Sequence, residues 1–148
     1  MNITVDRPHV AARLWPLLLL AACNTSHKEL LKAPEEQAAL RAMQTRLYDT
    51  ADEQATMRAV IATLQDLGIV IDDANAALGI VSGTKFDSAR YGGSTVRIQV
   101  AVKPHGGKQM SVRVSAQAGT KTVTDPGAYQ EFFVSLSKGM FLTAHEIE

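Results

Sequence analysis

Two neighbouring segments of this sequence alternate between apolar and polar residues with a period of two. In residues 95–103 and again in residues 108–118 the apolar side chains fall on even numbers, and Pro-His-Gly-Gly at 104–107 lies between them. A period of two is the pattern of a β-strand with one buried face, and a short Gly-containing connection joins antiparallel strands in a hairpin. The chain must therefore bury one face of an antiparallel sheet against a second layer.

The parity of the apolar residues also restricts the register of this hairpin. Directly facing residues must have numbers with an even sum, so that both apolar sets share one face. A three-residue loop at 105–107, with a glycine at positive φ, meets this condition, whereas a four-residue loop would oppose Lys103 and Lys108. The expected register places Arg97 opposite Ser115, Gln99 opposite Arg113, and Val100 opposite Val112 or Met110.

One helix is expected before these strands and one after them. Residues 50–68 begin with a Thr50–Glu53 capping box and end at Gly68. Their apolar residues recur at helical spacing: Met57, Val60, Ile61, Leu64 and Leu67. The last helix has Asp125 as its cap and Pro126 as its first residue, and Gly139 marks a kink or a close contact. Its apolar side comprises Tyr129, Phe132, Phe133, Leu136, Met140 and Phe141.

Shorter segments complete the expected sheet. Strand-like sequences cover residues 43–48, 69–73 and 80–86, and Gly83 interrupts the last of them. Asp72 and Asp73 are expected to end a strand before a turn at 75–79. Together the elements predict an α+β fold, in which an antiparallel β-meander of four to five strands packs against two helices as a two-layer sandwich.

The first 22 residues have the layout of a secretory signal peptide. A leader with Arg7 and Arg13 precedes a short apolar run, and this run is too short to span a bilayer. Residues 20–23, Leu-Ala-Ala-Cys, resemble the lipobox of bacterial lipoproteins. The resemblance implies cleavage before Cys23, a thioether-linked diacylglyceryl group on its sulfur, and acylation of the new amine. An ordinary signal peptide followed by a free or paired cysteine is the alternative, but Cys23 is the sole cysteine, and an odd thiol is uncommon in an oxidising compartment.

These segments predict the organisation of the whole chain. Residues 1–22 form the signal peptide, and residues 23–42 form the lipidated cysteine and a polar tether, with a short helix that opens at Pro34. Residues 43–148 form the α+β domain. By resemblance to Gram-negative sorting signals, Asn24 in place of Asp implies the outer membrane, with the domain facing the periplasm.

Neither the charge nor the reactive side chains of the sequence point to nucleic-acid binding or catalysis. The 148 residues contain 15 Lys and Arg against 15 Asp and Glu, which removes the electrostatic support for nucleic-acid binding. His27, His105 and His145 lack metal-ligand spacing. Ser82 and Lys85 form a Ser-x-x-Lys spacing, yet on a strand they point to opposite faces. We therefore predict no catalytic residue, no metal ion and no cofactor.

The polar face of the hairpin is the candidate binding surface. The residues proposed to bind are Arg97, Gln99, Lys103 and Arg113. Arginine supplies forked hydrogen bonds to acidic groups, which suits an acidic or polar partner. Tyr48, Arg90 and Tyr91 would extend the surface if their side chains point to the same face, but the sequence does not fix their directions. An ordinary solvated face is the alternative, because antiparallel sheets commonly have one.

Two segments resemble small proteobacterial envelope lipoproteins whose function is unassigned. They are Gln-Asp-Leu-Gly-Ile at 65–69 with Leu-Gly-Ile-Val at 78–81, and Asp-Pro-Gly-Ala-Tyr-Gln-Glu-Phe-Phe at 125–133. The resemblance covers residues 41–147 and carries no catalytic motif. The order of helix, leucine-glycine turn and meander is also similar to the helix-grip domains of the C lipoprotein of the outer-membrane barrel-assembly machine, a likeness of fold rather than of function.

The sequence thus predicts a membrane-anchored periplasmic lipoprotein that is not an enzyme and that binds or supports an envelope complex. Its expected partners are the membrane, through the acyl chains on Cys23, and an envelope protein. A lipid or small-ligand carrier is a second hypothesis and would need a cavity between helices and sheet. A hydrolase is a third, and it would need a pocket that gathers Ser82, Lys85 or a histidine with oriented partners.

Overall fold

The computed structural model of the chain describes residues 27–87 and 89–145. The signal peptide, Cys23 and Asn24 lie outside the described residues. The chain divides into two units between Gln37 and Ala38, and the second unit contains all of the strands and the two later helices.

Helix α1 spans His27–Gln44 and begins earlier than expected. The segment before Pro34 was expected to be an irregular tether, but it is helical, and Pro34 lies inside the helix. A proline in a helix interior removes one backbone hydrogen bond and costs about 3 kcal/mol. Leu, Glu and Ala occur on both sides of Pro34 and are strong helix formers, which favours continuing the helix through it.

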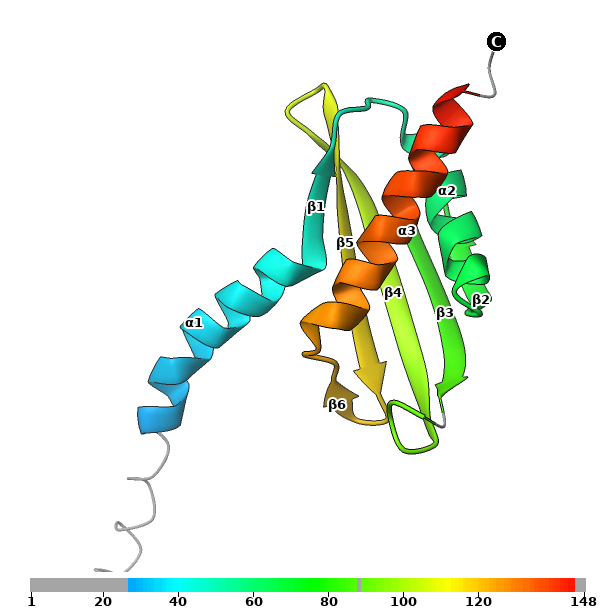
Figure 1. The fold of residues 1–148 in the computed structure, drawn as a ribbon. Helices are drawn as coiled ribbons and strands as arrows, with labels where there is room; N and C mark the ends of the chain where they lie inside the picture. Colours follow the sequence, from blue (N-terminus) through cyan, green and yellow to red (C-terminus); the bar gives the residue numbers. More distant parts are fainter. Residues whose placement is uncertain (1–26, 88, 146–148) are drawn as a thin grey trace, which may run out of the picture. The chain divides into compact units, whose positions relative to one another are not determined.

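A single antiparallel sheet forms one layer of the second unit (Figure 1). Its strands lie in the order β1-β5-β4-β3-β2, and the two-residue strand β6 pairs with β5. The strands are β1 (Thr45–Tyr48), β2 (Val70–Asn75), β3 (Ile80–Asp87), β4 (Ser94–His105), β5 (Gln109–Ala118) and β6 (Lys121–Thr122). The predicted α+β class and the antiparallel meander are confirmed, with one short strand more than expected.

Helices α2 (Glu53–Asp66) and α3 (Pro126–His145) cover one face of this sheet, where Figure 1 shows α3 crossing the strands. The buried core lies between the two layers and includes Val60 and Leu64 of α2, Phe132 and Leu136 of α3, and Val100 of β4. The even-numbered residues of β4 and β5 face these helices, as the alternation predicts. Among the described residues of the second unit, no helix covers the opposite face of the sheet, which is called the open face from here on.

The register of the central hairpin differs from the prediction by two residues. Val100 faces Val114, so that both Val112 and Met110 were wrong as its partner. Arg97 faces Gln117 and Gln99 faces Ser115. The residue numbers of facing partners still add to an even number, as parity requires, but the loop comprises residues 106–108 instead of 105–107. Gly106 and Gly107, which lie in the loop in either register, both have positive φ, a conformation that glycine adopts at no steric cost, and the ladder extends to the His105–Gln109 pair.

The edge strand β2 also differs from its prediction. Asp72 and Asp73 do not end the strand; they lie within it, next to a register shift between Ile71 and Asp73. Such a bulge, together with charged side chains, discourages an edge strand from pairing with another chain. The strand ends instead at Asn75, whose side-chain oxygen accepts a hydrogen bond from the backbone of Leu78.

Gly83 does not interrupt β3, which runs through it as a continuous strand. A Cβ added at Gly83 would lie 2.7 Å from both Ile69 Cγ2 and the Val70 carbonyl oxygen. The glycine is therefore a point of close backbone approach between β3 and β2.

Of the two predicted helix caps, the one for α2 is wrong and the one for α3 is confirmed. The N-cap of α2 is Asp52, whose carboxylate accepts a 2.8 Å hydrogen bond from the backbone of Ala55, and Thr50 instead accepts one from the backbone of Asp52. The predicted capping box is therefore wrong, because a better acceptor stands two residues later. Asp125 does cap α3, accepting a hydrogen bond from Gly127.

The apolar side of α3 is buried as far as Leu136, and Met140 is half-buried. Phe141, by contrast, is 63% exposed. It follows Leu136 by five residues, which at about 100° per residue turns it well away from the core stripe. Gly139 makes the expected close contact, because a Cβ there would touch Thr63 of α2 at 3.7 Å.

Candidate functional site

The four candidate binding residues lie together on the open face of the sheet. Arg97, Gln99 and Lys103 project from β4 and Arg113 projects from the adjacent β5, and all four are exposed. Both strands are internal to the sheet, so their backbones are hydrogen-bonded on both sides. The side chains are therefore carried on a rigid surface.

The open face has an unequal distribution of charge. In β1, β3, β4 and β5 no Asp or Glu occupies an open-face position; Asp87 of β3 points to the helix side. Acidic residues appear on this face at the edge strand β2, where Asp72 accepts a hydrogen bond from Thr84. In the part of the chain that the structure describes, the sole ion pair is Arg90–Glu131, so none reaches Arg97, Lys103 or Arg113.

A shallow hollow of about 400 Å³ lies on the same face around Arg97. Hydroxyl and amide side chains supply most of its polar groups, namely those of Ser82, Gln99, Ser115 and Gln117. Asp72 adds one carboxylate to the lining. Two exposed apolar side chains flank it, because Val70 faces Thr84 across the β2–β3 ladder and Phe86 follows on β3. The sequence did not identify this hollow, since β2 and β3 had no assigned register.

Tyr48, Arg90 and Tyr91, whose directions the sequence left open, do not extend the open face. Tyr48 lies against α3, with its hydroxyl 3.4 Å from Ser137 Oγ. Burial raises the pKa of Tyr48 above its usual range. Arg90 and Tyr91 line a pocket on the helix side of the sheet. Sequence alone could not fix their directions, because both lie in a loop.

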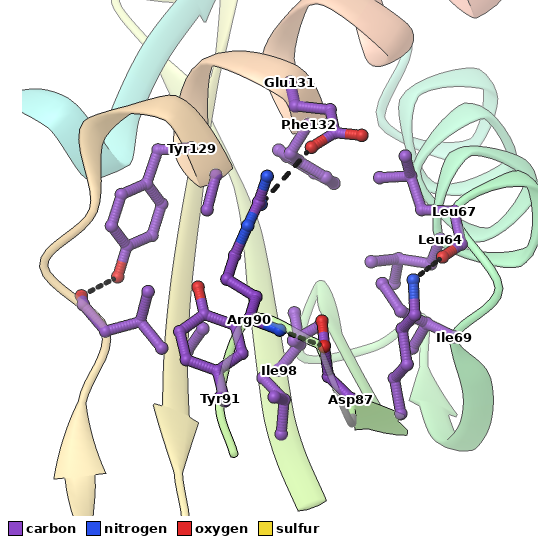
Figure 2. Close-up of a pocket in the computed structure, with 15 residues that line it drawn as sticks. Leu64, Leu67, Ile69, Asp87, Arg90, Tyr91, Ile98, Tyr129, Glu131 and Phe132 are labelled. Carbon is purple, nitrogen blue, oxygen red and sulfur yellow. Dashed lines mark hydrogen bonds and ion pairs between the residues drawn. The ribbon is translucent and has the colours of Figure 1, made fainter. Parts of the chain in front are cut away.

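That pocket is the second candidate site, and Figure 2 shows it between the end of α2, the start of α3 and the sheet. Its volume is about 110 Å³, and its floor is apolar, with Leu64, Ile69, Val96, Ile98 and Phe132 among the lining residues. The pocket is assembled from segments far apart in the sequence, so no local pattern could reveal it.

Four charged residues stand around this pocket: Lys85, Asp87, Arg90 and Glu131. Lys85 Nζ donates a 2.8 Å hydrogen bond to the Leu67 carbonyl, and Arg90 pairs with Glu131 at 3.5 Å. The backbone N–H groups of Arg90 and Ala89 donate to Asp87 Oδ1 at 2.8 and 3.0 Å. Chiefly because of the bond from Arg90, the pKa of Asp87 lies below its usual range, so this carboxylate is ionised at neutral pH.

The residues considered for catalysis are not gathered in one place. Lys85 lines the pocket, whereas Ser82 lies on the opposite face of the sheet beside the hollow. His105 ends β4 next to the hairpin loop, at the other end of that strand from the pocket. Within residues 34–87 and 89–141, no three His, Cys, Asp or Glu side chains cluster as metal ligands would. None of the described helices is long and apolar enough to cross a membrane.

Comparison with known proteins adds no family to these observations. The chain matches no protein-family model and no curated protein sequence.

Proposed function

We propose that this chain is a lipid-anchored, non-catalytic binding protein of the bacterial cell envelope. Acyl chains on Cys23 would hold it at the outer membrane, facing the periplasm, and the open sheet face would dock an acidic segment of an envelope protein. The lipobox at residues 20–23 supports the anchor. The observation that carries the docking site is a set of three cations, Arg97, Lys103 and Arg113, that form no ion pair with any described residue. They lie on a face whose four strands β1, β3, β4 and β5 present no carboxylate.

Cations on a sheet are stabilised when acidic side chains stand opposite them on the next strand. Here the register instead gives Arg97 the neutral neighbours Thr84 and Gln117, and gives Arg113 the neighbours Ala101 and Thr45. Complementary carboxylates can then be supplied by another molecule. Arginine binds a carboxylate through two parallel hydrogen bonds, which adds geometric specificity to the attraction.

The hollow around Arg97 supports the same proposal. Its glutamine and serine side chains offer both donors and acceptors, which suits the backbone and polar side chains of a peptide. The flanking Phe86 and Val70 are 68% and 69% exposed, so a partner that covers them gains burial of apolar surface. Because β3 to β5 are rigid, little conformational entropy is lost when the partner binds.

The pocket between the helices and the sheet supports the lipid-carrier hypothesis less well than the open face supports docking. Pockets that enclose a drug-sized ligand usually measure about 300–1,000 Å³. The pocket between helices and sheet measures about 110 Å³, too little for an acyl chain of membrane length. The hydrolase hypothesis required Ser82, Lys85 or a histidine to converge with oriented partners, and Ser82 and Lys85 are on opposite faces.

Site-specific photo-crosslinking in living cells tests the proposal. A photoreactive phenylalanine analogue replaces Gln99 on the open face in the full chain, and a matched substitution replaces Gln65, which is exposed on α2. We expect a protein adduct from position 99 and none from position 65. The adduct should disappear when Arg97→Gln and Arg113→Gln are added, and persist with Arg58→Gln on α2. Equal adducts at both positions, or an adduct insensitive to the two open-face arginines, would contradict the proposal.

A further inference from the structure

The pocket shown in Figure 2 lies on the other side of the sheet from the proposed docking face, and it has the dimensions of a site for one side chain. A cavity of about 150 Å³ lined by aliphatic and aromatic residues is large enough to hold benzene. This pocket, at about 110 Å³, is smaller and opens to solvent. Its floor therefore suits a branched aliphatic group of about four carbon atoms.

The charges around the pocket alternate in sign. Asp87 interacts electrostatically with both Lys85 and Arg90, and Arg90 in turn pairs with Glu131. The charged groups around the rim therefore alternate in the order Lys85 (cation), Asp87 (anion), Arg90 (cation) and Glu131 (anion). A ligand that carried one charge alone would meet repulsion from half of this rim, whereas a ligand with both charges would find partners for each.

The rim groups also have hydrogen-bonding capacity left. Lys85 uses one of its three ammonium donors on Leu67, and Arg90 uses Nη1 on Glu131, out of five donors. Asp87 receives both of its backbone hydrogen bonds on the same oxygen, Oδ1. A carboxylate can accept about four, so Asp87 can also accept from an ammonium group.

From this floor and this rim we propose that the pocket binds a free α-amino acid with a branched aliphatic side chain. The side chain fills the apolar floor between Leu64, Ile98 and Phe132. The carboxylate of the ligand is held by Lys85 and Arg90, and its ammonium group by Asp87 and Glu131. Binding of an amino acid in this pocket does not depend on the proposed docking at the open face. A negative result for one site therefore leaves the proposal for the other site unchanged.

Calorimetric titration of the protein as extracted from membranes in detergent micelles tests this proposal, with empty micelles as the blank. The probe is L-leucine, and it should bind at least ~20-fold more tightly than glycine, because each buried methylene contributes ~0.8 kcal/mol, or about fourfold in affinity. Leucinamide lacks the carboxylate and 4-methylpentanoate lacks the ammonium group. Each should bind at least ~10-fold more weakly than leucine, since a hydrogen bond to a charged group is lost.

A pair of matched variants locates the site. Ala128→Leu adds a side chain to the wall of the pocket at the start of α3, and should abolish leucine binding. Ala62→Leu makes the same change on the exposed side of α2 and should leave the affinity unchanged to within about twofold. Circular dichroism shows whether each variant is folded, and the ligand series on the unsubstituted chain does not depend on either.

Two results would overturn the proposal. Absence of leucine binding to the unsubstituted chain would mean that the charged rim serves only to join the β3–β4 loop to α3. Binding of 4-methylpentanoate as tight as that of leucine would assign the pocket to apolar carboxylates instead of amino acids.

Discussion

Lys85 Nζ lies 2.8 Å from the carbonyl oxygen of Leu67, the C-cap residue that directly follows α2. The last carbonyl groups of a helix have no partner within the helix, and a cation near them is favoured by the helix dipole. This one hydrogen bond joins strand β3 to the C-terminal end of α2 beside the pocket.

Replacing Lys85 by Met should therefore lower the free energy of unfolding by about 1–2 kcal/mol, because a hydrogen bond to a charged group is removed while the apolar stem is kept. Urea denaturation measures the change. Lys138→Met on the exposed part of α3 is the matched control and should shift the stability by less than about 0.5 kcal/mol. Equal effects of the two substitutions would contradict the role of the Leu67 contact.

Tyr129 stands at the centre of a buried polar network. Its hydroxyl donates a 2.6 Å hydrogen bond to the Val123 carbonyl and accepts one from Gln44 Nε2 at 3.1 Å. Tyr129→Phe leaves both groups buried without this partner and should cost about 2–3 kcal/mol. Tyr48→Phe loses a longer contact of 3.4 Å to Ser137 and should cost under about 1 kcal/mol in the same thermal or urea unfolding experiment.

Two glycines should respond to alanine with opposite signs. Gly83→Ala places a Cβ 2.7 Å from the Val70 carbonyl oxygen, and backbone cannot move aside easily, so stability should fall by about 1–3 kcal/mol. Gly139→Ala meets Thr63 Oγ1 at 3.7 Å, an ordinary contact, within a helix. Stability should rise by about 0.5–1 kcal/mol, because glycine loses more entropy in a helix than alanine does. A stabilised Gly83→Ala variant would show that β2 and β3 are less closely apposed.

Asp87 should contribute to the loss of folding stability at acid pH. Its folded-state pKa is lowered by the backbone hydrogen bond from Arg90, so the stabilisation is present above the unfolded pKa and is lost as the pH falls through the folded value. Carbon-13 NMR titration should place the Asp87 carboxyl below about 3.9, the usual aspartate value. Asp87→Asn should make unfolding less sensitive to pH below about 4. A titration at or above the usual value would contradict the turn geometry.

The central hairpin shows how far sequence reasoning reaches in this protein. Alternation fixed which residues of β4 and β5 are buried, because a shift of one residue would expose every valine. The choice between two registers of equal parity depended on loop geometry, and Gly106 and Gly107 are both in the loop, each with positive φ. The predicted loop 105–107 contained the same two glycines, so the glycine content could not distinguish the two registers, and the prediction was wrong by two residues.

The two candidate sites also differ in how far the sequence could predict them. Arg97, Gln99, Lys103 and Arg113 could be assigned to one face because they lie on strands with clear alternation. Arg90 and Tyr91 could not, since the direction of a loop side chain depends on tertiary contacts such as the Arg90–Glu131 pair. The pocket on the helix side became visible only with the packing of α2, α3 and the β3–β4 loop.

Intact-mass and fragment-ion analysis of the protein extracted from membranes tests the account most directly, because the proposed anchor sets where the domain works. We predict a chain that begins at Cys23 and carries a diacylglyceryl thioether on the sulfur and an amide-linked acyl chain on the amine. A chain that retains Met1, or one with a free thiol at Cys23, would contradict the account.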